Sequence, residues 1–436
     1  MVHTYDIVII GAGILGTAIS YFLKPLNKTK DIVVIEQENT AAYHTSSRNT
    51  GKVHGPYLYN PETKKLFANT AFHGFDMLDT YTKSHNIPFK KDGVIEVALD
   101  AKGAKTLKKY LKWGKQNGLA EKDIEIFEKN EFKKIEPNVE CEEAIFCYRD
   151  ASTDYGKITK SIMKDSKNTG TKFLLNQRVT GVSKSNGMWK ITLNHEKEIL
   201  AKFVINAAGG ESIDIAHDMG VGEEYTDVHF RGEYWKAPKK YNNLTKTSIY
   251  SVPEFPEYPF LDPHWIIRVD GRCEVGPNAV PVFSPYGYKK SENIKEFVPK
   301  MLEMLSSGAR KAIFDKQFQK LALSEIQSSM SKSSMIDRVK RFLPMIESDK
   351  FLERGTAGIR SSVINDKGKF MSDVILGKNE NSFHILNYNS PGATGSLPFS
   401  AYIINLLHED GLLQYEKTDT ICGHWKFSEI IEKISV

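Results

Sequence analysis

The sequence predicts an α/β fold on a parallel sheet, built by a discontinuous domain into which a second domain is inserted. Three observations predict it: a strand–glycine turn–helix–strand unit opens the chain, and buried strands run into glycines at 202–210 and again at 382–396. Strands that alternate with helices are typical of parallel sheets. Blocks of different character, about 85–150 and 226–345, separate the three signals, so the second domain is expected there.

The opening unit is complete within the first 36 residues. Residues 6–10 are a β-branched apolar run suited to a strand buried on both faces. Residues 17–23 carry apolar side chains at helical spacing, and Pro25 is expected to stop that helix. Residues 31–36 form a second buried strand that ends in an acid. This is one βαβ unit.

The later elements are read in chain order from period and composition. We expect helices at 61–83, 101–133, 294–322 and 397–409, of which the lysine-rich stretch 101–133 presents a solvated face. We expect strands at 90–99, three in succession over 168–200, at 202–210, across 228–283 and at 382–389.

Composition narrows the class of protein. Lys plus Arg number 59 and Asp plus Glu 54, with no dense basic tract, which argues against nucleic-acid binding. The four cysteines form no CxxC pair and the twelve histidines no metal-ligand spacing, so we expect neither a disulfide framework nor a metal site. No signal peptide pattern opens the chain and no apolar run reaches about 18 residues, so a cytoplasmic protein is expected.

The glycine turn after the first strand carries a dinucleotide-binding fingerprint. In Gly11-Ala-Gly13-Ile-Leu-Gly16, the first glycine permits the tight turn, the second lets the backbone approach a pyrophosphate, and the third allows close helix–strand packing. The helix N-terminus that follows favours phosphate. Glu36 ends the second strand and is expected to accept hydrogen bonds from ribose hydroxyls.

Two distant segments favour FAD over NAD. Residues 204–210, VINAAGG, form a strand-to-glycine turn that can approach the same cofactor again. Residues 390–396, SPGATGS, open a late helix, whose N-terminus can stabilise negative charge on the N1/C2=O region of a flavin. The expected fold is therefore a discontinuous Rossmann-like FAD-binding domain with an inserted mixed-sheet α+β substrate domain. We assign 1–84, 151–225 and 346–410 to the first, 85–150 and 226–345 to the second, and 411–436 to a C-terminal extension.

Several segments together resemble the L-2-hydroxyglutarate dehydrogenase/oxidase family, within the FAD-dependent, D-amino-acid-oxidase-like superfamily. The matching stretches are DIVIIGAGILG, HTSSRNTGKVHGPYLYNP, FRGEYW, GRCEVGPNAVP, GTAGIRSS and NSPGATGSLPFSAYI, from residue 6 to 404. The resemblance implies that a hydride passes from the substrate C2–H to flavin while a base removes the hydroxyl proton. L-Malate competes with L-2-hydroxyglutarate as the substrate, in which case the chain is a malate:quinone oxidoreductase-type member.

Such a site needs a base and a carboxylate clamp. We expect His54 to be the base, since histidine is near neutral at physiological pH and it lies in the segment expected beside the flavin ring. We expect Arg360 to be the clamp, because a guanidinium holds a carboxylate with two parallel hydrogen bonds and related members place an arginine after a comparable glycine-rich strand. The other expected substrate contacts are Arg231, Lys52 and Arg268 for a second carboxylate, and Tyr57, Asn278 and Asn389 as polar or pocket-lining residues.

A larger set is assigned to the cofactor by the glycine segments and by the polar stretch before residue 52. The expected cofactor-binding residues are Gly11, Gly13, Ile14, Leu15, Gly16, Glu36, Ser46, Ser47, Arg48, Thr50, Gly51, Val179, Ala208, Gly209, Gly358, Gly392, Thr394, Gly395 and Ser396.

The sequence thus predicts an FAD-dependent dehydrogenase of an L-2-hydroxy dicarboxylic acid that passes electrons to a quinone or another carrier. The alternatives are an oxygen-dependent amino-acid or amine oxidase of the same superfamily and a non-catalytic flavoprotein subunit. The stripe Phe427, Ile430, Ile431 and Ile434 follows helical spacing. It is expected to pack on the protein itself, with peripheral contact to the cytoplasmic membrane face as the alternative.

Overall fold

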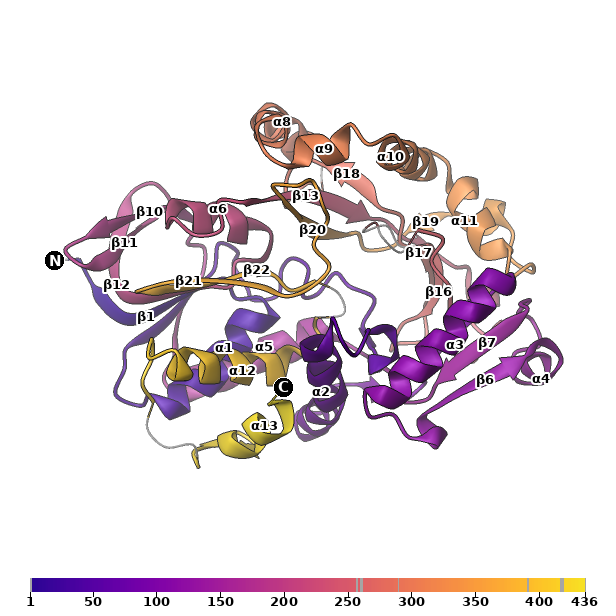
Figure 1. The fold of residues 1–436 in the computed structure, drawn as a ribbon, viewed down its shortest axis with the longest axis horizontal. Helices are drawn as coiled ribbons and strands as arrows, with labels where there is room; N and C mark the ends of the chain where they lie inside the picture. The colour runs from indigo at the N-terminus through magenta and orange to yellow at the C-terminus, as the bar shows by residue number, and fades with distance from the viewer. Residues whose placement is uncertain are drawn as a thin grey trace.

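A computed structural model describes residues 2–255, 258, 262–288, 290–389, 392–415 and 419–435, with the side chains of 290–292 excepted. Two eight-stranded sheets dominate the molecule, and a three-stranded sheet runs between them (Figure 1). Residues 390–391 of the predicted late glycine turn lie outside the described residues.

The first sheet has a parallel centre. Its parallel strands are, in spatial order, β22 (Ser382–Asn387), β12 (Lys197–Asn206), β1 (Thr4–Ile10), β2 (Ile32–Ile35) and β9 (Lys172–Leu174). Antiparallel strands β10 (Val179–Ser185), β11 (Met188–Leu193) and β21 (Ile375–Asn379) extend it. The three strand-to-glycine signals in the sequence, at β1, β12 and β22, are therefore adjacent strands, and their carboxyl ends share one edge.

Helices cover both faces of this sheet. One face packs against α1 (Ile14–Leu26), α2 (Lys65–Ser84), α5 (Tyr155–Asn168), α12 (Ser396–Glu409) and α13 (Phe427–Ile434) in one hydrophobic core. The other face packs against α6 (Ser212–Asp218). Pro25 lies in the last turn of α1, where it has no N–H to donate to the Tyr21 carbonyl, and the helix ends one residue later.

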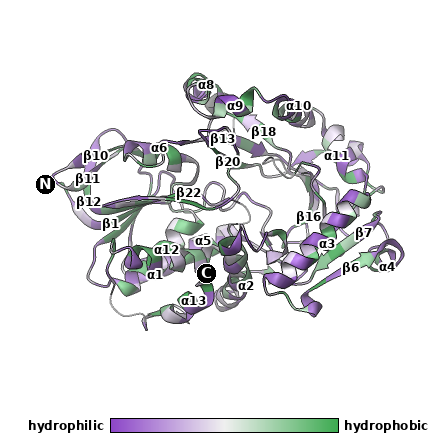
Figure 2. Cartoon of the chain, in the orientation of Figure 1, coloured by the Kyte–Doolittle hydropathy of each residue, from purple (hydrophilic) through white to green (hydrophobic). Residues whose placement is uncertain are grey.

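The second sheet is mixed. Its order is β19 (Glu353–Arg354), β14 (Trp235–Lys236), β17 (Cys273–Gly276), β16 (His264–Ile267), β15 (Ser248–Ser251), β5 (Val94–Ala98), β7 (Glu143–Cys147) and β6 (Ile124–Glu128). Helix α3 (Ala101–Gln116) packs on one face and α11 (Lys332–Lys340) on the other, while α4 (Lys129–Ile135) follows β6. In Figure 2, α3 alternates between the hydrophilic and hydrophobic colours, as its lysines and buried apolar residues require.

The three-stranded sheet joins segments far apart in sequence. It has the order β18 (Val280–Val282), β13 (Tyr225–Gly232) and β20 (Gly358–Asn365). Helices α7 (Lys290–Lys295), α8 (Phe297–Ser306), α9 (Ala309–Ile313) and α10 (Lys316–Met330) lie on the outer side of it, at the edge of the molecule (Figure 1). The remaining strands are the small sheet β3 (Lys52–Val53), β8 (Ala151–Thr153) and β4 (Phe89–Lys90), and the hairpin β23 (Ile421–Cys422) and β24 (Trp425–Lys426).

Two expected elements differ in the structure. The lysine-rich stretch 101–133 is not wholly helical, because β6 pairs with β7 along its length and splits α3 from α4. The last of the three strands expected over 168–200 and the strand expected at 202–210 form one long strand, β12, whose first half pairs with β11 and whose last residues pair with β22. In both cases a partner strand from elsewhere in the chain decided the outcome, which local patterning does not report.

The C-terminal stripe is buried. Phe427, Ile430 and Ile434 of α13 are each at most 4% exposed and belong to the core shared with α2 and α12. The expectation that it packs on the protein itself is confirmed, and its alternative use as a membrane-facing surface is wrong. Among the described residues, no helix is both long and apolar enough to cross a bilayer.

We expect Phe427→Ala to lower the free energy of unfolding by about 3–5 kcal/mol, the usual cost of removing a buried aromatic ring. The measurement is the midpoint of urea denaturation. Glu432→Ala, one turn away on the exposed face of α13, is the matched control and should leave the midpoint nearly unchanged. Equal midpoints for Phe427→Ala and wild type would contradict the packing of α13 as a core element.

Candidate active site

The turn between β1 and α1 is too tight for side chains. Gly11 has φ +100°, and a Cβ there would lie 2.6 Å from the carbonyl oxygen of Ala207. A Cβ on Gly16 would lie 1.9 Å from the carbonyl oxygen of Gly11, so α1 packs directly on the turn. Gly13 is the N-cap of α1 and has no side chain of its own to cap the helix, while Ser46 Oγ accepts from the Ile14 N–H. The turn therefore presents bare backbone at a positive helix end, as a phosphate requires.

Glu36 closes the same turn from the end of β2. Its carboxylate accepts hydrogen bonds from the Ala12 N–H at 2.8 Å and the Glu38 N–H at 2.9 Å. Burial raises the pKa of Glu36, while these backbone donors oppose the rise. The carboxylate lines the cavity beside the turn and is held in place to accept further bonds from a ribose.

Three cavities of about 130, 240 and 140 Å³ follow one another from this turn. The first and second share Gly13, Ser46 and Gly209 as walls, and the second and third share Thr50 and Arg360. The first borders Glu36, the second borders the turn before α12, and the third borders the second sheet. An elongated dinucleotide fits the first two, and its redox-active end would then lie next to the third. The residues present therefore fit FAD.

Most predicted cofactor residues lie along these walls. Those lining the first or second cavity are Gly11, Gly13, Ile14, Leu15, Glu36, Ser46, Thr50, Val179, Ala208, Gly209 and Gly392. Ser46 also accepts a hydrogen bond from the Ile14 N–H at 2.9 Å. Gly16, Ser47, Gly51, Thr394, Gly395 and Ser396 line none of the three cavities. Arg48 and Gly358 line only the third.

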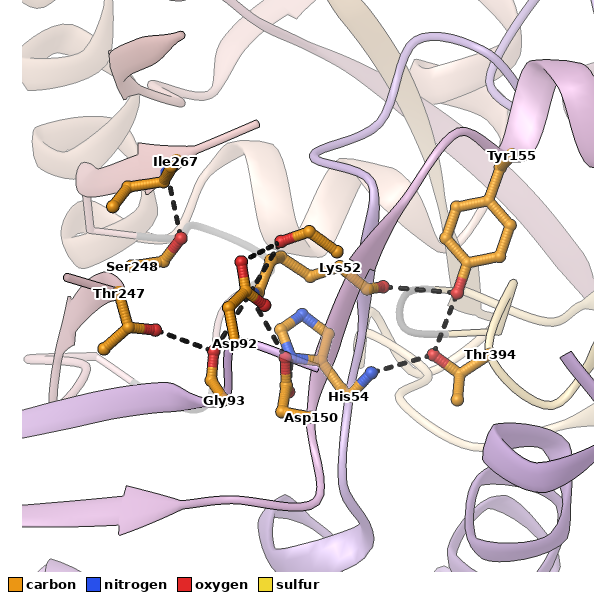
Figure 3. Close-up of polar contacts among 11 residues, drawn as sticks. Lys52, His54, Asp92, Gly93, Asp150, Tyr155, Thr247, Ser248, Ile267 and Thr394 are labelled. Carbon is orange, nitrogen blue, oxygen red and sulfur yellow. Dashed lines mark hydrogen bonds and ion pairs between the residues drawn. The ribbon is translucent and has the colours of Figure 1, made fainter. Parts of the chain in front are cut away.

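His54 lies where the second and third cavities meet. Its Nδ1 lies 3.0 Å from Oδ2 of Asp150, and its backbone N–H donates to Oγ1 of Thr394 at 3.0 Å (Figure 3). A carboxylate only accepts, so the Nδ1 proton is fixed toward Asp150 and Nε2 keeps its lone pair. The histidine is thus oriented by a loop of the second domain and by the turn before α12.

Asp150 is a site residue that the sequence analysis missed. Its side chain is fully buried, and it precedes β8. The only available signal was an acid beside a short β-forming run, which is common in any sequence. Its role depends on a contact across 96 positions of the chain.

Lys52 lines the second cavity, but its ammonium is bound by other groups of the protein. Its side chain is fully buried, and its ammonium donates to Asp92 Oδ1, the Gly93 carbonyl and Ser152 Oγ at 3.0–3.1 Å (Figure 3). An ammonium has three N–H donors, and these contacts use them all. The geometry therefore argues against Lys52 as a ligand of the second substrate carboxylate.

Arg231 and Arg268 are likewise engaged away from the cavities. Arg231 donates to Glu233 Oε1 at 2.8 and 3.1 Å and to the Gly287 carbonyl. Arg268 donates twice to Glu274 Oε2 and once to the Asn49 carbonyl. Neither arginine lines the second or third cavity. Both arginines form ion pairs within the protein, with Glu233 and Glu274, and this geometry argues against them as ligands of the second substrate carboxylate.

Arg360 lines both the second and the third cavity. It stands on β20 opposite Phe230 of β13. Burial lowers the pKa of Arg360, because the site is poorly hydrated. An anion beside this guanidinium would recover part of that cost, so a substrate carboxylate is favoured there.

The predicted polar residues fall on different sides of the site. Asn389 lines the second cavity and donates to Asn387 Oδ1 at 2.7 Å. Asn278 lines the third and accepts from the Glu233 N–H at 2.8 Å. Tyr57 lines none of them, since it is 2% exposed and packs on Tyr110.

The third cavity brings in residues that the sequence did not single out. Tyr234, Tyr250 and His264 line it, and all come from the second sheet or its edge. Burial lowers the pKa of His264 to about 3, so this histidine is neutral at physiological pH. No periodicity points to them, because their common wall exists only when the second sheet closes over β20.

Comparison with known proteins places the chain in a family. The family model described as DAO, FAD dependent oxidoreductase, matches residues 6–406. The chain is 30% identical to the L-2-hydroxyglutarate dehydrogenase of Indibacter alkaliphilus, covering 90% of this chain and 96% of that one. It is 28% identical to the mitochondrial L-2-hydroxyglutarate dehydrogenase of Homo sapiens, covering 92% and 88%.

Solved structures share the fold. An L-α-glycerophosphate oxidase from Mycoplasma pneumoniae with FAD bound aligns with a TM-score of 0.74 at 21% identity, covering 98% of each chain. A glycine oxidase from Geobacillus kaustophilus aligns with a TM-score of 0.68 at 14% identity, covering 93% of this chain and 95% of that one. With its glycine cradle, its cofactor-sized run of cavities and a family match over most of its length, the chain belongs to the FAD-dependent oxidoreductases of the DAO family.

Proposed function

We propose that the protein is an FAD-dependent dehydrogenase that oxidises an L-2-hydroxy dicarboxylic acid, L-2-hydroxyglutarate in the first place and L-malate as the alternative, to the 2-oxo acid. The observation that carries the proposal is the placement of His54 and Arg360 at the junction of the flavin-sized cavity and the third cavity. The relatives named L-2-hydroxyglutarate dehydrogenase support the substrate class.

The chain supplies the acid–base part of the reaction. FAD, when bound, accepts the hydride from the substrate C2. His54 Nε2 takes the proton of the C2 hydroxyl, and Asp150 holds the Nδ1–H and stabilises the imidazolium that results. Arg360 holds the C1 carboxylate and so fixes which face of C2 is presented.

Arg48 is the best placed cation for the second carboxylate. It lines the third cavity with Arg360. Its guanidinium lies 4.3 Å from the ring centre of Tyr288 and donates to the Tyr43 carbonyl. Among the described residues, no carboxylate lies within ion-pair distance of Arg48, in contrast to Arg231 and Arg268. We therefore propose Arg48 as the ligand of the second carboxylate, in place of Arg231, Lys52 and Arg268.

We expect His54→Gln to slow reduction of the bound FAD by L-2-hydroxyglutarate by about 10²–10⁴-fold, the usual contribution of a general base. Glutamine keeps a polar group of similar length but cannot take the proton. The measurement is anaerobic rapid mixing followed by the loss of flavin absorbance, with His3→Gln at the exposed N-terminus as control. An unchanged rate in His54→Gln would remove His54 from the mechanism.

We expect L-2-hydroxyglutarate or L-malate to reduce the FAD far faster than L-lactate, which lacks the second carboxylate. Arg360→Lys should impair all three acids, because lysine does not reproduce the planar fork and all three share the C1 carboxylate. Arg48→Gln should instead erase the advantage of the dicarboxylates, and the surface variant Arg272→Gln should change neither. If lactate or a neutral amino acid is the best reductant of the wild type, the monocarboxylate or amine-oxidase alternative takes its place.

A quinone is the proposed electron acceptor, and α8–α10 are the proposed peripheral contact with the membrane. The exposed apolar side chains gathered on these helices are Phe297, Val298, Leu302, Leu305, Phe314, Leu323, Ile326 and Met330. The exposed cations Lys295, Arg310, Lys311, Lys316 and Lys320 outnumber the exposed acids Glu296 and Asp315. Exposed apolar side chains together with an excess of exposed cations suit an anionic bilayer, whereas two such surfaces would repel each other in a symmetric dimer.

We expect the FAD-loaded protein to co-sediment with phosphatidylglycerol vesicles and less with phosphatidylcholine vesicles. Leu302→Ser with Leu323→Ser should reduce that binding by about tenfold or more, since each loses apolar contact area. Ile421→Ser, at an exposed isoleucine of the β23–β24 hairpin, is the control. Retention of full vesicle binding, or a change in oligomeric state alone, would contradict the membrane assignment.

A further inference from the structure

A buried charge cluster stands behind His54. The Lys52 ammonium lies 3.1 Å from Asp92 Oδ1 and 3.4 Å from Asp150 Oδ1, while Asp150 Oδ2 lies 3.0 Å from His54 Nδ1 (Figure 3). The side chains of Lys52 and Asp150 are fully buried, and that of Asp92 is 3% exposed. Water therefore screens none of these charges well.

The cluster does not balance its own charge. One ammonium and two carboxylates leave a net charge of −1, and a proton on His54 brings the sum to zero. Because a poorly hydrated site disfavours net charge, removal of either buried charge changes the electrostatic cost of placing a proton on His54. Removal of the Lys52 ammonium favours that proton, and removal of the Asp92 carboxylate disfavours it.

The other groups around His54 are neutral except Arg360, whose charge is the same in every variant compared below. Tyr250 and His264 face His54 from the second sheet, and Tyr155 of α5 contacts Thr394, which accepts from the His54 N–H. Burial raises the pKa of Tyr155 and Tyr250 and lowers that of His264, so all three are neutral near pH 7. Arg360 is the remaining cation on the cavity side. The charges that face His54 are therefore those of Asp150, Lys52, Asp92 and Arg360.

We propose that Lys52 and Asp92 are positioning residues that set, through Asp150, the pH at which His54 releases its proton. The inference rests on the proposed role of His54 as the base. Lys52 was expected to bind the second substrate carboxylate, and this inference gives it a different function. Its ammonium does not contact the substrate but influences whether His54 is unprotonated and able to act as the base. The Gly93 carbonyl accepts hydrogen bonds from the Lys52 ammonium at 3.0 Å and from Thr247 Oγ1 at 2.8 Å. This carbonyl therefore links the position of the ammonium to the segment that leads into β15.

The test compares variants of opposite sign. In FAD-loaded protein with ¹⁵N-labelled histidine, Lys52→Met should move the titration midpoint of the His54 imidazole up by about one pH unit or more, and Asp92→Asn should move it down. The double variant Lys52→Met/Asp92→Asn removes one charge of each sign and should return close to the wild-type midpoint. Lys91→Met, an exposed neighbour, should leave the midpoint unchanged.

The low-pH limb of FAD reduction by L-2-hydroxyglutarate should move in the same direction as the NMR midpoint. Asp92→Asn and the double variant keep the test decisive if Lys52→Met does not fold. Midpoints that stay fixed, or that move in the same direction in Lys52→Met and Asp92→Asn, would overturn the inference. If the midpoints move as expected while no 2-hydroxy acid reduces the FAD, the proposed function fails. The inference that Lys52 and Asp92 set the titration of His54 then still holds.

Discussion

Burial of the Lys52 ammonium is the constraint on which the site depends. Transfer of a charge out of water is tolerated only with close partners, and here those partners come from two separate segments of the chain. Asp92 and Gly93 follow β4, whereas Asp150 and Ser152 flank the start of β8. To satisfy the ammonium, these segments must meet at β3, and His54 lies two residues further along. The same contact thus joins the segments around β3, β4 and β8 and fixes the position of His54.

The turn between β1 and α1, where the cofactor is expected, depends on a different constraint: Gly11 and Gly16 have no side chains. At Gly11 and Gly16 the backbone of α1, the β1 turn and residue Ala207 approach too closely for a Cβ. That closeness brings the carboxyl ends of β1, β12 and β22 to one edge, where the first two cavities open. Glu36 and Ser46 hold the turn by accepting hydrogen bonds from the backbone N–H groups of Ala12 and Ile14.

Between these ends, the distribution of arginines decides what the third cavity can bind. Arg231 forms an ion pair with Glu233 and Arg268 forms one with Glu274, so a carboxylate of the protein already balances each charge. Arg48 and Arg360 line the cavity itself. The wall opposite is made of tyrosines and a neutral histidine, which can donate hydrogen bonds without adding charge. Such a chamber favours an anionic substrate over an amine.

The sequence by itself determined the α/β class, the glycine cradle, Glu36 and the use of FAD, because these follow from short-range rules: buried β-branched runs, glycine spacing and an acid at a strand end. It also marked His54 and Arg360. Only the tertiary structure decided that Lys52, Arg231 and Arg268 are internal ion pairs, that Asp150 backs His54, and that Tyr250 and His264 face the site. Which side chains become partners depends on which strands become neighbours. The sequence around a lysine or arginine is therefore the same whether the charge pairs with a buried carboxylate or binds a substrate.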